Sequence, residues 1–196
     1  MDLADAVELT WMETDALNDQ PIRDRAQELL DNGKAKHLET SYLATRSGQH
    51  AKVESIAELI FPTEMGGPPS MPNEIRSSVS KTADLTTSQA YTSFTTRNIG
   101  TTFSIDPVLG SDRSTIDINM GPEITDFIGW DFHGKEPAQV VQPVVTHLGV
   151  STAISSRKGK AILAGMHTPI DRKSRKPKNG KRVLVFITGA AKEVGK

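Results

Sequence analysis

Histidines and carboxylates are the side chains of this sequence with the clearest chemical potential. Asp131 and His133 occupy alternate positions of a strand-like run, which places a carboxylate and an imidazole on one face, and Glu123 and Asp126 precede them. Such a set could bind a divalent metal ion. No further ligand spacing supports a metal site, and polar residues of a solvated edge strand explain the pattern better. We therefore expect neither a metal nor another cofactor.

Motifs of the common enzyme classes are absent from the sequence. There is no Gly-x-Ser-x-Gly, no His-Glu-x-x-His, and no Walker or Rossmann glycine pattern. The glycine pair in Met65-Gly66-Gly67-Pro68 neither follows a clear strand nor opens a helix, so it does not predict a phosphate-binding loop. We expect a protein that is not an enzyme.

A basic run near the C-terminus is the strongest charge feature. Pro177 and Asn179-Gly180 predict that it is a loop. It could be a solvated hairpin tip, a docking element for an acidic partner such as the acidic helices of a neighbouring copy, or a contact for an anionic surface. No aromatic residues are interleaved to stack bases, so we expect no sequence-specific nucleic-acid binding. The cations are Arg172, Lys173, Arg175, Lys176, Lys178, Lys181 and Arg182.

Composition bounds the remaining possibilities. The 196 residues carry a net charge of −1, yet residues 1–31 are acidic and residues 157–182 are basic. Such a division can orient neighbouring copies, although two separately solvated surfaces are the more common outcome. The chain has no cysteine, which excludes disulfides, and no apolar run approaches the ~20 residues of a membrane helix. The acidic start lacks a secretory signal, so either the protein is cytoplasmic or a signal preceded Met1.

Two helices are expected at the N-terminal end. Apolar residues recur at helical spacing over Ala4–Leu17, and a second stripe runs from Pro21 to about Leu30, where Pro21 suits a first turn. Asn32-Gly33 predicts the end of the second helix. We expect a helical segment over residues 1–33 and a β-rich domain over residues 34–190.

A glycine-tipped hairpin is predicted directly after the helices. Its arms are 38–45 and 51–56, and its turn is Arg46-Ser47-Gly48-Gln49. A similar order recurs at 147–165, where the turn contains Gly159 and the second arm ends near Gly165. The match predicts related hairpins side by side in one sheet, unless two generic hairpins agree by chance.

The middle of the chain alternates between weak and strong strand signals. Residues 62–90 are rich in Pro and Gly and then in Ser and Thr, which favours a mobile loop. A strand is expected over 91–97. A second runs from Gly100 to beyond Pro107, with Thr101, Phe103 and Ile105 inward. A third covers 115–120, has Ile116, Ile118 and Met120 on one face, and ends at residues 121–123. Residues 124–133 extend that strand or begin an edge strand, and 134–143 form a loop.

The C-terminal stretch from Leu148 to Thr188 reads as three short strands. Arg157-Lys158-Gly159-Lys160 predicts the tight turn between the first two. Val183–Ile187 is an unbroken, β-branched apolar run, typical of a strand buried on both sides. We expect all three strands in one sheet, which makes the fold class α+β: a mostly antiparallel sheet of hairpins with two N-terminal helices.

The order of these elements resembles the C-terminal homology domain of bacterial secretins, the outer-membrane ring proteins of type II and III secretion and of type IV pili. The resemblance rests on Thr45–Gln49, Ile99–Asp112, Ile116–Glu123, Ser151–Gly165 and Arg182–Thr188, taken in this order. It implies an extracytoplasmic, β-rich subunit, located in the periplasm, outer membrane or cell surface, that pairs strands with its neighbours. Its architectural residues would be Arg46, Gly48, Gln49, Gly100, Pro107, Gly159 and Gly165, with Gly48 and Gly159 at hairpin tips and Gly100 and Pro107 bracketing a strand.

One segment departs from the family pattern. Secretins normally have an apolar Val-Pro-x-Leu-Gly-x-Ile-Pro segment before the last strand, and this chain has the charged interval 166–180 instead. The resemblance thus implies a reduced secretin-like core that forms homo-oligomers and has pilus or secretion-system components as further partners. A surface-exposed β-domain that binds a partner or host molecule, and a cytoplasmic protein that binds anionic polymers through residues 172–182, are the alternatives.

Overall fold

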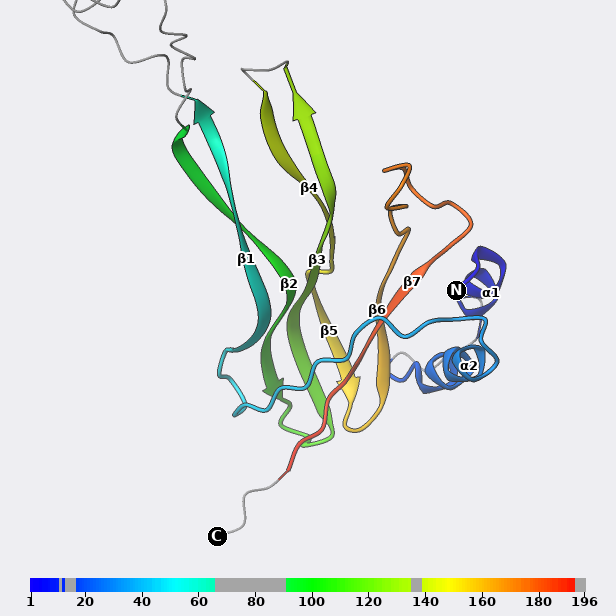
Figure 1. The fold of residues 1–196 in the computed structure, drawn as a ribbon. Coiled ribbons are helices and arrows are strands. Elements are labelled where there is room, and N and C mark those ends of the chain that lie inside the picture. Colours follow the sequence, from blue (N-terminus) through cyan, green and yellow to red (C-terminus); the bar gives the residue numbers. More distant parts are fainter. Residues whose placement is uncertain (11, 13–16, 66–90, 135–138, 193–196) are drawn as a thin grey trace, which may run out of the picture. The chain divides into compact units, whose positions relative to one another are not determined.

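The computed structural model describes residues 1–10, 12, 17–65, 91–134 and 139–192. It contains two helices and seven strands, and the strands are antiparallel wherever their register is described. These elements are α1 (Leu3–Thr10), α2 (Gln20–Asp31), β1 (Ala51–Met65), β2 (Tyr91–Leu109), β3 (Thr115–His133), β4 (Val140–Gly149), β5 (Thr152–Arg157), β6 (Ala161–His167) and β7 (Val183–Thr188) (Figure 1). The predicted α+β class, mostly antiparallel sheet with two short N-terminal helices, is confirmed.

The chain divides into two compact units. Unit 1 comprises Met1–Ile56, Gly100–Thr125 and Thr146–Lys196, and unit 2 comprises Ala57–Ile99 and Asp126–Val145. A five-stranded sheet has the order β1-β2-β3-β4, with β5 paired to β3. The strands β6 and β7 form a separate two-stranded sheet.

The five-stranded sheet buries one face within unit 1. Ile105 of β2 and Ile116, Ile118 and Met120 of β3 form a buried cluster, called here the sheet core. Their alternate spacing follows from the twofold side-chain period of a strand. The predicted inward positions Ile105, Ile116, Ile118 and Met120 are therefore confirmed.

The strand β7 joins two apolar clusters in unit 1. Val185 and Ile187 pack against the sheet core, whereas Leu184 and Phe186 pack against a second cluster of Leu9, Ile22 and Leu29, called here the helix core. Figure 1 shows β6 and β7 between the helices and the β3–β5 part of the larger sheet. The strand predicted to be buried on both sides is packed on both faces, but its residues from Val183 to Ile187 are half-buried and not buried.

The helix α2 ends as its sequence predicts. The N–H of Lys34 donates to the carbonyl of Leu29 at 2.9 Å, and Gly33 has a φ of 72°. This left-handed residue turns the chain away from the helix axis. The first helix is shorter than expected, because α1 ends at Thr10, and residues 11 and 13–16 lie outside the described residues.

The expectation of one sheet containing both glycine-tipped hairpins and β7 is wrong. β5 pairs with β3, but β6 pairs with β7 in the other sheet, so the turn at Gly159 links two sheets and does not close a paired hairpin. The first predicted hairpin is wrong in its first arm: residues 36–46 contain no strand, and only the turn and β1 are formed. The two similar stretches, 37–56 and 147–165, thus differ in their strand pairing, because pairing depends on which other strands the fold places beside each of them.

Four strand boundaries also differ from the predictions, and one of them is the start of β4 at Val140, inside the loop expected over 134–143. β2 runs without interruption through Gly100 and Pro107, so these residues do not bracket a strand. β3 continues through 121–123 to His133, and β1 extends through Pro62 to Met65, into the predicted loop. The rest of that loop, 66–90, lies outside the described residues.

Unit 2 contains the parts of β1 to β4 that lie outside unit 1. Its one described ring pair is Phe127 and Trp130, whose centroids lie 5.2 Å apart in an edge-to-face arrangement. Large apolar side chains are exposed on three of its strands: Ile60, Phe94, Trp130 and Phe132.

Candidate interaction surface

Among the residues that the structure describes, none pairs its backbone with the outer edge of β7 from Leu184 to Thr188. On the other side of the pair, the N–H and carbonyl of Ala161 and the N–H of Leu163 bond to Asp19 and Gln20, away from β7. Ala161 pairs with Thr188 and Leu163 with Phe186 in the register. Because opposite residues of such pairs both direct their backbone groups outward, Phe186 and Thr188 present theirs on the free side of β7.

The same edge is paired just before β7 begins. The N–H of Arg182 donates to the carbonyl of Met1 at 3.0 Å, and the N–H of Leu3 donates to the carbonyl of Gly180 at 2.9 Å. Within the part of the chain that the structure describes, this pairing does not continue to Leu184, Phe186 or Thr188. An extended strand placed alongside β7 would therefore find unsatisfied donors and acceptors.

A second free edge belongs to β1. This strand stands at the end of the order β1-β2-β3-β4, so among the strands described it has a neighbour on one side only. Residues 52–56 of its unit 1 part are exposed. Two different open edges on one unit could join successive copies head to tail, an arrangement that closes into a ring if the rotation permits.

The basic loop, residues 171–182, is held in a defined conformation. The carboxylate of Asp171 accepts the N–H groups of Lys173 at 3.1 Å and Ser174 at 2.8 Å, and Ile170 forms an isolated β-bridge with Pro177. These bonds, led by the N–H of Ser174, lower the pKa of Asp171 from its ordinary value. Asp171 is thus occupied within the turn.

The seven predicted cations all lie in or beside this loop. Lys178 has its Nζ 3.9 Å from Asp171, Lys181 forms an ion pair with Asp2, and a guanidinium nitrogen of Arg182 donates to the carbonyls of Asn179 at 3.0 Å and Lys181 at 2.8 Å. The hydrogen bond from Lys181 lowers the pKa of Asp2. Lys173 and Lys176 are exposed and make no ion pair with the described part of the chain. Arg172 and Arg175 are exposed as well.

The predicted architectural residues fall into three places. Arg46, Gly48 and Gln49 form the turn before β1, where the N–H of Gly48, at a φ of 78°, donates to the carbonyl of Pro107 at 2.7 Å. Gly159, at a φ of 76°, occupies the β5–β6 turn. The remaining three lie within strands: Pro107 is in β2, a side chain on Gly100 of β2 would meet the Ser55 carbonyl, and one on Gly165 of β6 would meet Val150.

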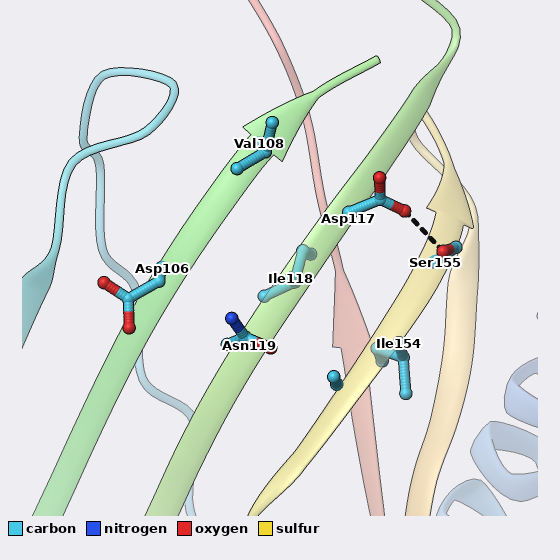
Figure 2. A pocket seen from close by; sticks show the side chains of 8 residues that line it. Asp106, Val108, Asp117, Ile118, Asn119, Ile154 and Ser155 are labelled. Atoms are coloured by element: carbon cyan, nitrogen blue, oxygen red, sulfur yellow. Dashed lines mark hydrogen bonds between the residues drawn. The ribbon is translucent and has the colours of Figure 1, made fainter.

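A shallow hollow of about 230 Å³ lies on the face of β2, β3 and β5 opposite the sheet core (Figure 2). Asp117 accepts a hydrogen bond from the hydroxyl of Ser155 across the strand pair. At the β2 side, Nδ1 of His50 lies 2.9 Å from Oδ1 of Asp106. The cross-strand registers Val108–Asp117–Ser155 and Asp106–Asn119–Ala153 account for this row of exposed polar groups.

Sequence reasoning missed both the open β7 edge and the polar hollow. The apolar run 183–187 predicts burial of side chains but carries no information on which backbone edge is paired. The hollow arises from residues of three strands, and only their register brings them together. The alternation of Asp117 and Asn119 with Ile116, Ile118 and Met120 was the signal available for its solvent-facing side.

Metal and membrane features give two further findings. Among the described residues, no three His, Asp or Glu side chains are placed so that they could hold a metal ion. No helix in that part of the chain is long and apolar enough to cross a bilayer.

Comparison of the chain with family models, with curated proteins and with solved structures found no match.

Proposed function

We propose that this chain is a non-enzymatic structural subunit that associates with copies of itself by strand pairing, as a reduced secretin-like core of an extracytoplasmic pilus or secretion assembly. The open outer edge of β7 carries the proposal. Its outward N–H and carbonyl groups have no backbone partner in the described part of the chain, and they lie on a strand whose two faces are already packed, so the backbone edge is what remains for contact. Proteins usually protect such an edge with charges, bulges or a covering element.

The exposed edge of β1 supplies a complementary surface for the same subunit. One copy would present β7 and the next would present β1, which gives a heterologous interface. The order of motifs from Thr45–Gln49 to Arg182–Thr188 resembles that of secretin domains and supports a ring as the product. Homo-oligomers, with pilus or secretion components as partners and a periplasmic or outer-membrane location, complete the proposal.

A proline at position 188 tests the role of the β7 edge. By the register, the N–H of Thr188 points away from β6, so Thr188→Pro removes an outward donor and leaves the β6–β7 hydrogen bonds in place. We expect the wild-type chain to form closed oligomers by light scattering and negative-stain microscopy, and Thr188→Pro to remain largely monomeric.

The matched control is Thr188→Ala, which changes the same exposed side chain but keeps the N–H. It should assemble like the wild type, and its thermal unfolding midpoint should match that of Thr188→Pro. A wild-type chain that stays monomeric at the highest concentration reached, or a proline variant that assembles normally, would overturn the proposal.

A further inference from the structure

The basic loop keeps a positive charge that its own unit does not neutralise. Residues 171–182 contain seven cations and a single carboxylate, Asp171. Asp171 is engaged by backbone N–H groups and lies 3.9 Å from Lys178. Lys181 is paired with Asp2, but Lys173 and Lys176 meet no carboxylate in the described part of the chain. The ammonium groups of Lys173 and Lys176 are therefore available to another molecule.

The loop presents these cations in a fixed geometry. The N–H of Asp171 donates to the carbonyl of Lys176 at 2.9 Å, and the N–H of Arg175 donates to the carbonyl of Asp171 at 2.8 Å. The N–H of Lys178 donates to the carbonyl of Pro169 at 2.8 Å, which closes the base of the loop. Because the backbone is already ordered, a partner does not have to immobilise it on binding.

A matching surplus of negative charge lies along α2. Asp24, Glu28 and Asp31 follow one another at spacings of four and three residues, so they share one face, called here the acidic stripe. This face is opposite the one that buries Ile22 and Leu29. All three members of the stripe are exposed.

The stripe is only partly neutralised. Asp24 accepts from the amide of Gln20 at 2.7 Å and Asp31 from that of Gln27 at 2.9 Å, and neutral amides do not cancel a charge. Glu28 shares the guanidinium of Arg25 with Glu8, at 2.7 Å and 3.7 Å. Residues 1–31 contain nine acidic and two basic side chains in all.

We propose that the basic loop of one copy docks on the acidic stripe of α2 of the next copy. The sizes agree: the stripe extends over roughly 10 Å of helix, and residues 172–176 can span at most ~16 Å. Both charged surfaces belong to one chain of net charge −1, which favours a second copy over a polyanion as the occupant. This contact rests on the proposed self-association and adds the element that sets the orientation of neighbouring copies.

A charge-swap pair tests the contact. Lys173→Glu with Lys176→Glu makes the loop repel the stripe, and Asp24→Lys with Asp31→Lys makes the stripe repel the loop. We expect each double variant alone to self-associate roughly tenfold more weakly than wild type at low salt. An equimolar mixture of the two should recover assembly, because each reversed surface then finds its opposite. Wild-type assembly should weaken as salt rises.

A control with the same change in net charge is Lys158→Glu with Lys160→Glu, in the β5–β6 turn, which should assemble like the wild type. A mixture that stays dissociated while wild type forms oligomers would overturn this contact and leave strand pairing intact. Loss of heparin binding by the loop variant without any loss of self-association would assign the loop to a polyanion and overturn the contact as well. A wild type that never assembles would overturn both proposals.

Discussion

Asp112 stabilises the turn between β2 and β3 through its carboxylate. It accepts the backbone N–H of Ser114 at 3.1 Å and of Thr115 at 3.0 Å, and both hydroxyls also donate to it. These bonds, the Ser114 hydroxyl first among them, hold the pKa of Asp112 well below its ordinary value. A short polar side chain thus replaces backbone pairing where the chain reverses.

The lowered pKa of Asp112 predicts a pH-dependent contribution to stability. A carboxyl whose pKa is lower in the folded state stabilises above its unfolded pKa, and the stabilisation disappears as pH falls through the folded pKa. We expect Asp112→Asn to be less stable than wild type near neutral pH, and the difference to shrink below about pH 4. Urea unfolding at a series of pH values measures it. A difference that stays constant down to acid pH would contradict the assignment.

At the scale of elements, Gly100 shows why β1 and β2 can approach so closely. A Cβ at this position would lie 2.1 Å from the carbonyl oxygen of Ser55 on β1, and its φ is 132°. Both the contact and the backbone conformation exclude a side chain.

We therefore predict that Gly100→Ala destabilises the chain by about 2 kcal/mol or more, because backbone must shift to admit the methyl group. Gly180→Ala is the matched control: no atom lies within 4 Å of its Cβ position and its φ is not positive. It should change the free energy of unfolding by less than ~0.5 kcal/mol. Equal effects of the two substitutions in denaturant titrations would refute the packing argument.

Local signals predicted the elements better than their pairing. The α2 stripe, the Gly33 terminus, the turns at Gly48 and Gly159 and the alternation of Ile116, Ile118 and Met120 are all decided by residues close in sequence. The separation of β5 from β6 is not, because Asp19 and Gln20 occupy the β6 edge from more than a hundred residues away. For the candidate surface, the positive charge of residues 171–182 could be predicted from the sequence. The open β7 edge could not, because it depends on where the backbone pairing of Met1–Leu3 with Gly180 and Arg182 stops.

At the scale of the whole molecule, unit 1 depends on β7 as the layer between two cores. Its odd-numbered residues pack on the sheet core and its even-numbered residues on the helix core. The N-terminal helices are therefore required to bury one face of the strand proposed for assembly. The acidic helix α2 and the basic loop both belong to unit 1, so the folding of this unit also fixes the spacing of the two charged surfaces.

This dependence predicts that a cavity in the helix core will loosen β7. Leu29 is 3% exposed, and Leu29→Ala should destabilise by about 2–4 kcal/mol, from lost burial and the cavity left behind. Hydrogen exchange should then show faster exchange at β6–β7 amides as well as in the helices, because Leu184 and Phe186 lose their packing. Leu38→Ala, at a side chain 53% exposed, should leave both unchanged. Faster exchange confined to α1 and α2 would show instead that β7 is held by the sheet core alone, and that the helices are not needed for the assembly edge.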